Sequence, residues 1–111
     1  MLGAGQYEEA IAQFDIVIRV LPKFAQAYNG RGMAYFHEDE FDLAFEDFDT
    51  AISLKPDLAD AYMNRVAVHL TREQIPEAIS DMRKALSLFE EQGKDERAKE
   101  VRVMLNIQEP K

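Results

Sequence analysis

The sequence predicts an all-α fold made of antiparallel helix pairs, and two observations lead to this prediction. Apolar residues recur at steps of three and four, which is the spacing of one face of a helix and not the alternation of a strand. The chain also repeats itself: Pro22 and Pro56 stand 34 positions apart, and each follows an apolar run. Self-similarity at this period is typical of arrays in which each unit stacks on the next.

The repeat is visible when the chain is shifted by 34 residues. Residues 25–58 then lie over 59–92, and nine positions hold the same residue in both copies: Ala25/Ala59, Ala27/Ala61, Tyr28/Tyr62, Arg31/Arg65, Ala44/Ala78, Asp47/Asp81, Ala51/Ala85, Ser53/Ser87 and Leu54/Leu88. Residues 1–24 lie over 35–58 in the same way, with identities at Ala10/Ala44, Phe14/Phe48, Asp15/Asp49, Ile18/Ile52 and Pro22/Pro56.

The spacing of particular residue types resembles the tetratricopeptide repeat (TPR) family, whose unit is a helix A, a turn and a helix B. In residues 25–58 the positions typical of the family hold Tyr28, Gly32, Tyr35, Ala44, Phe48, Ala51 and Pro56. The third copy departs from the pattern at Val66, His69 and Glu90. The resemblance implies a right-handed superhelical stack, here of about two and a half repeats.

The phase of the repeat divides one predicted domain, residues 1–111, into four elements. Residues 1–24 form half a repeat with helix B only, and residues 25–58 and 59–92 are full repeats. Each proline that closes a helix B does so because the preceding residue avoids the α region. Residues 93–111 begin with a glycine that favours a helix stop and continue as a capping helix and tail.

The capping helix has apolar residues at helical spacing, and charged residues flank them in the sequence. Its apolar positions are Ala98, Val101, Met104 and Leu105. Repeat arrays need such a helix, polar on its outer side, to end the stack in water. An amphipathic helix of the calmodulin-binding type or one that binds a membrane surface is the alternative, which the mixed signs of its charges disfavour.

The first helix B lacks a helix A of its own repeat, so part of its apolar face has no predicted cover. The residues concerned are Tyr7, Ile11, Phe14 and Ile18. Exposed apolar patches of this kind mark interaction sites or aggregation hazards. Two interpretations stay open: the chain is a segment of a longer array, or a second copy covers the patch and forms a homo-oligomer.

Two arginines and two aspartates recur together in the full repeats. Arg31 precedes Asp47 by sixteen residues, and Arg65 precedes Asp81 by the same distance. A ligand site with two basic residues is one interpretation. We favour structural ion pairs that tie helix A to helix B within each repeat.

Composition argues against several classes of function. There are 13 basic and 21 acidic residues, a net charge of −8, which disfavours nucleic acid and anionic membranes as partners. Cysteine is absent, no run approaches the roughly 18 apolar residues of a membrane span, and the two histidines lack a ligand constellation. We therefore expect no enzyme, metal or cofactor, and take the cytoplasm as the default location.

The family resemblance implies that A helices line a concave surface that binds a protein or peptide partner. The residues placed there by the repeat pattern are Gln26, Asn29, Met33, Phe36, His37, Asp60, Met63, Asn64, Ala67 and Leu70. Methionines suit adaptable apolar contacts, and the amides can bond a peptide backbone. Some family members clamp a chaperone's terminal carboxylate with lysine and asparagine. Of the clamp positions considered, Asn29, Met33 and Asn64, none holds a lysine, and only Asn64 fits that pattern.

Overall fold

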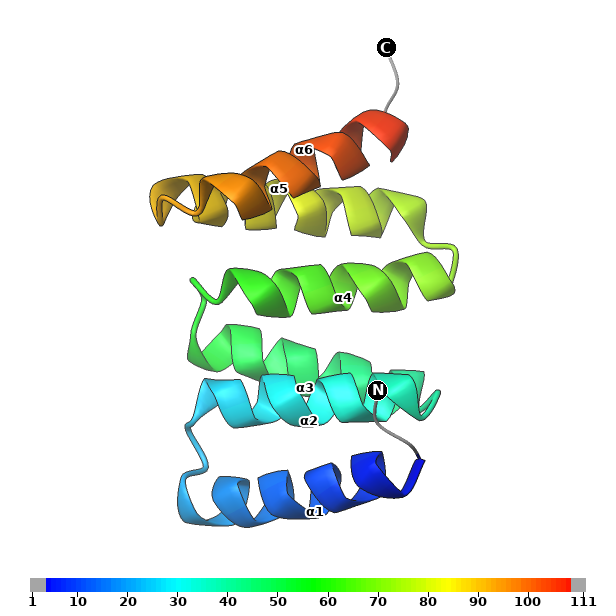
Figure 1. The fold of residues 1–111 in the computed structure, drawn as a ribbon, viewed down its shortest axis with the longest axis vertical. Helices are drawn as coiled ribbons and strands as arrows, with labels where there is room; N and C mark the ends of the chain where they lie inside the picture. Colours follow the sequence, from blue (N-terminus) through cyan, green and yellow to red (C-terminus); the bar gives the residue numbers. More distant parts are fainter. Residues whose placement is uncertain (1–3, 109–111) are drawn as a thin grey trace. The chain divides into compact units, whose positions relative to one another are not determined.

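A computed structural model describes residues 4–108 of the chain, and this part contains helices and turns only. The helices are α1 (Ala4–Val20), α2 (Ala25–His37), α3 (Phe41–Leu54), α4 (Ala59–Thr71), α5 (Ile75–Glu91) and α6 (Asp95–Gln108) (Figure 1). The predicted all-α class is confirmed. Helices α2 and α4 begin 34 positions apart, at the expected starts of the two full repeats. None of the described helices combines the length and the apolarity that crossing a membrane requires.

Proline sets three helix boundaries as the sequence predicts. Helix α1 ends at Val20, two residues before Pro22, and α3 ends at Leu54, two residues before Pro56. Pro76 lies in the first turn of α5, where its missing N–H has no helical partner to lose.

The turns use left-handed backbone conformations at equivalent places. Asp39 and Glu73, 34 positions apart in the turns before α3 and α5, have φ values of 60° and 58°. Aspartate adopts this conformation more readily than most residues, whereas glutamate at position 73 carries no sequence signal for it. Gly93 ends α5 at φ 69°, as predicted. That conformation suits glycine, which has no Cβ to clash.

The chain forms two compact units, residues 1–56 and 57–111. In the first unit α2 packs against both α1 and α3. Its core is made largely of small residues around one large ring: Ala25, Ala27, Ala34, Ala44, Phe48 and Ala51. Small residues allow helix backbones to approach closely, while a large ring fills the remaining gap.

In the second unit α5 packs against both α4 and α6. Besides five alanines, the core here contains more large residues than that of the first unit: Tyr62, Val66, Val68, Met82, Leu88, Phe89 and Val101. Helix α6 buries Ala98 and Val101, whereas Val103 and Ile107 remain more than half exposed. The sequence-based division into a half repeat, two repeats and a cap stays a prediction.

Candidate functional site

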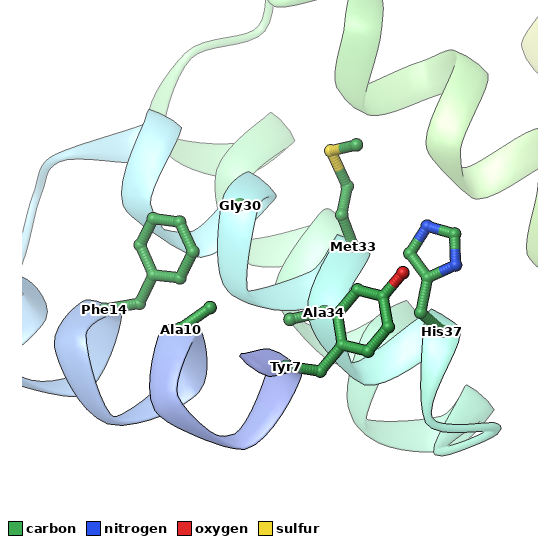
Figure 2. Close-up of a pocket in the computed structure, with 7 residues that line it drawn as sticks. All are labelled: Tyr7, Ala10, Phe14, Gly30, Met33, Ala34 and His37. Atoms are coloured by element: carbon green, nitrogen blue, oxygen red, sulfur yellow. The ribbon is translucent and has the colours of Figure 1, made fainter. Parts of the chain in front are cut away.

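An apolar groove of about 370 Å³ lies between α1 and α2 (Figure 2). It is lined by Tyr7, Ala10, Phe14, Gly30, Met33, Ala34 and His37. The only polar side-chain atoms in the lining belong to the tyrosine hydroxyl and the imidazole, so a ligand here would be held mainly by apolar contacts.

The groove exists because α1 is a helix B with one side uncovered. Its lining residues Tyr7, Ala10 and Phe14 are the repeat counterparts of Phe41, Ala44 and Phe48 on α3. On α3, helix A of the same repeat covers these positions: Ala44 is 0% exposed and Phe48 1% exposed. On α1 the counterparts are only half-buried, and no other described helix of this unit lies over them.

Two glycines of α2 lie against neighbouring helices: Gly30 faces α1 and Gly32 faces α3. A Cβ on Gly32 would stand 2.6 Å from Cε1 of Phe48, and a Cβ on Gly30 would stand 2.4 Å from Cζ of Phe14. Each glycine therefore admits a phenylalanine ring from a neighbouring helix B. The ring of Phe48 is enclosed in the core, whereas the ring of Phe14 forms a wall of the open groove (Figure 2).

An aromatic stack closes the other end of the groove. The rings of Tyr7 and His37 are 4.9 Å apart and nearly parallel, at 13°. Such offset stacking favours a fixed ring arrangement. Met33 lies between this stack and Phe14 in Figure 2, and its side chain is 44% exposed. A flexible thioether at this place can adapt to different ligand surfaces.

Two sets of residues that the sequence keeps apart meet in this groove. Met33 and His37 belong to the predicted peptide surface, and Tyr7 and Phe14 to the predicted self-association patch. The remaining members of that patch, Ile11 and Ile18, are half-buried and do not line the groove.

The other residues of the predicted peptide surface have varied surroundings. Phe36 packs edge-on against Phe41 at 5.3 Å, inside the α2–α3 pair. The carboxylate of Asp60 lies 3.0 Å from Arg97 of α6. The remaining positions range from the exposed Gln26 to the half-buried Asn29, Met63, Asn64, Ala67 and Leu70. Their role in binding stays a prediction.

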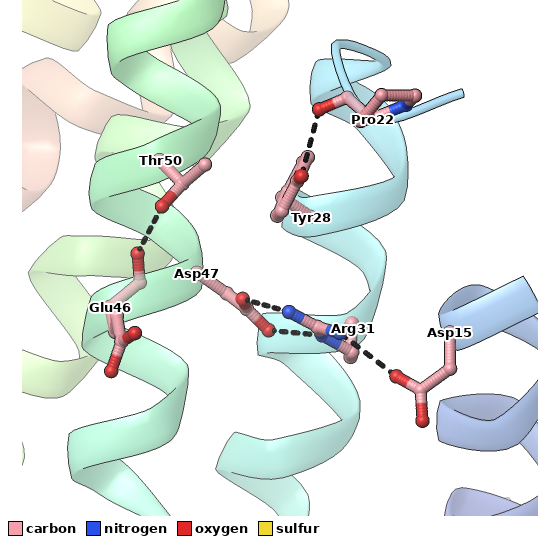
Figure 3. Close-up of polar contacts among 7 residues, drawn as sticks. All are labelled: Asp15, Pro22, Tyr28, Arg31, Glu46, Asp47 and Thr50. Carbon is pink, nitrogen blue, oxygen red and sulfur yellow. Dashed lines mark hydrogen bonds and ion pairs between the residues drawn. The ribbon is translucent and has the colours of Figure 1, made fainter. Parts of the chain in front are cut away.

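Arg31 connects three helices of the first unit (Figure 3). Its Nε and Nη2 donate to Asp47 on α3 at 2.9 and 2.8 Å, a two-point contact. Its Nη1 donates to Asp15 on α1 at 2.8 Å. The spacing of sixteen residues predicted the first partner. The second comes from the preceding helix B, which the sequence analysis did not anticipate.

Arg65 makes the equivalent two-point contact in the second unit. Its Nε and Nη2 each donate to Asp81 at 2.7 Å. His69, buried beside this pair, has Nε2 3.3 Å from an Asp81 oxygen and Nδ1 2.9 Å from the amide oxygen of Gln74. His69, at which the third copy departs from the family pattern, therefore makes polar contacts within the core. Each arginine thus binds the aspartate on the helix B of its own repeat that lies sixteen residues later in the sequence.

Two side chains at the Arg31 ion pair have pKa values that depart from their ordinary values. Hydrogen bonding to Asp47 raises the pKa of the Arg31 guanidinium above its ordinary value, and the contact with Asp15 adds to this effect. Burial raises the pKa of Tyr35, whose ring lies 5.8 Å from the Arg31 guanidinium carbon. Between residues 4 and 108, no three acidic or histidine side chains are grouped so that they could hold a metal ion.

A second apolar surface lies where α1 ends and the chain turns into α2. A pocket on this surface is lined by Val20, Leu21, Pro22, Lys23 and Phe24. Val20 is 70% exposed and Leu21 54% exposed. Helical periodicity does not reveal this surface, because its residues belong to the helix end and the turn rather than to the periodic face.

Comparisons with known proteins agree with the repeat pattern. A family model described as tetratricopeptide repeat matches residues 2–59. No curated protein sequence matches the chain. Among solved structures, the Yersinia enterocolitica type III secretion translocator chaperone SycD is similar at a TM-score of 0.86 and 19% identity, over 94% of this chain and 72% of that one.

Two further structures hold chaperone partners. The TPR2B domain of yeast Sti1, in a complex with Hsp70, is similar at a TM-score of 0.86 and 19% identity, over 94% of this chain and 83% of that chain. The first TPR of Spaghetti, bound to the HSP90 peptide SRMEEVD, has a TM-score of 0.73 and 26% identity, over 91% and 81% of the two chains.

Proposed function

The chain belongs to the tetratricopeptide repeat family, and we propose that it is a non-enzymatic protein-interaction module that binds a helix of a partner in the α1/α2 groove. One observation carries the proposal: the groove exposes on α1 the face that a helix A covers on α3. Similar structures support a peptide-binding role, because SycD has been solved with a peptide of the translocator YopD and Spaghetti with an HSP90 peptide.

The way helix A packs on α3 indicates which side chains a ligand helix should present to α1. On α3 the ring of Phe48 meets Gly32 of helix A, and the ring of Phe41 meets Phe36 one turn further on. A ligand helix should therefore offer a small or branched residue to Phe14 and a larger apolar residue to Tyr7, four positions apart. This is the helix-in-groove mode of peptide recognition.

The wider peptide surface predicted from the sequence remains part of the proposal. Its amides, Asn29 and Asn64, would bond the backbone of a bound peptide. We propose that this surface does not clamp an acidic chaperone tail, because the clamp positions considered hold no lysine. The net charge of −8 also opposes approach of an acidic peptide.

The proposal is tested with a fluorescent peptide that spans α4, a helix A from this chain, titrated with the 111-residue protein. We expect a dissociation constant on the order of 10–100 μM, because a single helix buries a small interface. The double change Ala10→Glu and Met33→Glu should weaken binding at least tenfold. The matched control, Ile16→Glu with Leu43→Glu, places the same two charges on exposed apolar residues outside the groove.

Equal binding by the groove variant and the control would contradict the proposal. A parallel titration with SRMEEVD tests the clamp: carboxylate-dependent binding as tight as that of the α4 peptide would contradict its expected absence. Circular dichroism of each variant confirms that a loss of binding is not a loss of fold.

Self-association through α1 is a second candidate function. It is favoured by the position of Tyr7 and Phe14, which line the same groove that a partner helix would occupy. A mass that increases with protein concentration in light scattering would support it, and a constant monomer mass would exclude it.

A further inference from the structure

Helix α6 shares part of the sequence pattern of a helix A. Laid over α2 and α4 without gaps, it matches three positions of the A pattern: Ala98 with Ala27 and Ala61, Arg102 with Arg31 and Arg65, and Ile107 with Phe36 and Leu70. Helix α5 has 17 residues whereas α3 has 14. The extra length moves α6 out of the 34-residue phase, so the period alone does not reveal the match.

Only one side of α6 is covered. The side toward the preceding helix B is buried, since Ala98 is 1% exposed, as its counterpart Ala27 is 2% exposed. The side that faces the following helix B in the other repeats is open. Val66 is 1% exposed against α5, whereas its counterpart Val103 is 54% exposed and Ile107 is 68% exposed.

Within residues 4–108, neither α1 nor α6 is covered by the complementary helix that completes a repeat. Helix α1 is a helix B whose A-facing residues border an open groove, and α6 is a helix A whose B-facing residues are exposed. We propose that α6 of one copy occupies the α1/α2 groove of a second copy, so that the two half repeats complete each other. This inference rests on the proposed helix-binding function of the groove and names its occupant.

The apolar residues of α6 suit the groove. By the repeat pattern, Val103 would face Phe14, as Val66 stands at the equivalent place on α4. Ile107, one turn later, would face Tyr7 as Phe36 faces Phe41 on α3. These contacts would bury the two most exposed apolar residues of α6 in an apolar site, which supplies the driving force for association.

The polar residues also correspond. Arg31 uses Nη1 for Asp15 on the preceding helix B and Nε and Nη2 for Asp47 on its own helix B. Arg102 already pairs through Nη2 with Glu90 of the preceding helix B, at 2.8 Å. The counterpart of Asp47 on α1 is the exposed Gln13, with Glu9 one turn earlier. An incoming Arg102 would therefore meet an amide oxygen and a carboxylate.

Such an interface is heterologous, because the two copies contribute different surfaces. Each associated copy keeps either the groove of its first unit or the α6 of its second unit free for a further copy, so association proceeds head to tail and is not limited to a pair. An isologous dimer, in which two α1 helices cover each other, would stop at two copies.

The test combines two blocked variants of the 111-residue chain. The groove-blocked variant carries Ala10→Glu and Met33→Glu, and the helix-blocked variant carries Val103→Glu and Ile107→Glu. Glutamate is a good helix former, and Met33, Val103 and Ile107 are exposed in the single copy, so folding should be kept. The control Ser80→Glu with Ser87→Glu adds the same charge to exposed positions of α5.

Sedimentation equilibrium measures the mass of each sample as concentration rises. We expect the unmodified chain and the control to exceed the dimer mass. Each blocked variant should stay a monomer, and their equimolar mixture should form a dimer that grows no further. This complementation is specific to a head-to-tail contact, since each variant lacks a different half of the interface.

Two outcomes would overturn the inference. An unmodified chain that remains a monomer up to about 1 mM would exclude even a weak interface of this size. Continued association of the helix-blocked variant would show that another surface fills the groove. In both cases binding of the α4 peptide to the helix-blocked variant still decides the proposed function separately, because that assay needs the groove but not α6.

Discussion

Helices α1 and α3 are two copies of one helix B, and they differ in what lies over them. Phe48 of α3 is 1% exposed and meets Gly32, whereas its counterpart Phe14 on α1 is half-buried and borders a groove. Asp47 of α3 is buried and accepts two hydrogen bonds from Arg31, whereas its counterpart on α1 is the exposed Gln13.

The difference shows that the same apolar stripe becomes core or binding surface according to its neighbour. A helix B buries its stripe only when helix A of the same repeat lies across it. The substitutions below compare residues that contact α1 with residues that contact α3, so each result either sharpens the contrast between the two helices or removes it.

The largest effect should come from truncating the equivalent phenylalanines. Phe48→Ala should lower the free energy of unfolding by about 3–5 kcal/mol, because it empties an enclosed core site. Phe14→Ala should cost about 1 kcal/mol, because its ring already borders open space and loses less burial. Urea denaturation of both variants gives the comparison. Equal losses would mean that α1 is as well covered as α3.

The next effect concerns the two carboxylates that bind Arg31. Asp47→Ala should cost about 2 kcal/mol, because its side chain is 6% exposed and its loss leaves the guanidinium without its two-point partner. Asp15→Ala should cost less than about 1 kcal/mol, since that carboxylate is 46% exposed. Thermal unfolding of each variant measures the difference. A reversed order would place the main anchor of Arg31 on α1.

The two glycines of α2 should respond differently to an added methyl group. Gly32→Ala places a Cβ 2.6 Å from the enclosed Phe48 ring and 3.2 Å from the Ala44 carbonyl oxygen, which should cost about 1–3 kcal/mol. Gly30→Ala presses on Phe14, whose ring can turn into the groove, and alanine gains about 1 kcal/mol in helix propensity. The net effect should lie within about 0.5 kcal/mol of zero. Chemical denaturation distinguishes the two, and a large loss at Gly30 would mean that Phe14 is fixed.

The smallest effect is a pH dependence from Tyr35. An unfolded tyrosine loses its proton near pH 10, whereas burial raises the pKa of the folded side chain and holds it protonated to higher pH. The unfolded state then binds fewer protons, so the free energy of unfolding falls as pH rises above about 10. Tyr35→Phe should remove this part of the decline, measured by denaturation between pH 8 and about 11. An unchanged decline in the variant would assign it to other groups.

Much of this protein is encoded in local patterns of the amino-acid sequence. Helical spacing, the 34-residue period and the prolines predict the helices and their phase, because each depends on residues close together in the chain. The pairing of Arg31 with Asp47 was also predictable, since two copies hold the same residues at the same separation.

Other features depend on packing between helices, which the one-dimensional pattern does not specify. The period assigns Met33 and Phe14 to different surfaces, yet the way α1 and α2 pack brings them to one groove. It does not reveal Asp15 as a second partner of Arg31, or the left-handed turns at Asp39 and Glu73. Helical spacing states which residues share one face of a helix; which face is covered, and which is left open to a partner, follows only from where the neighbouring helices lie.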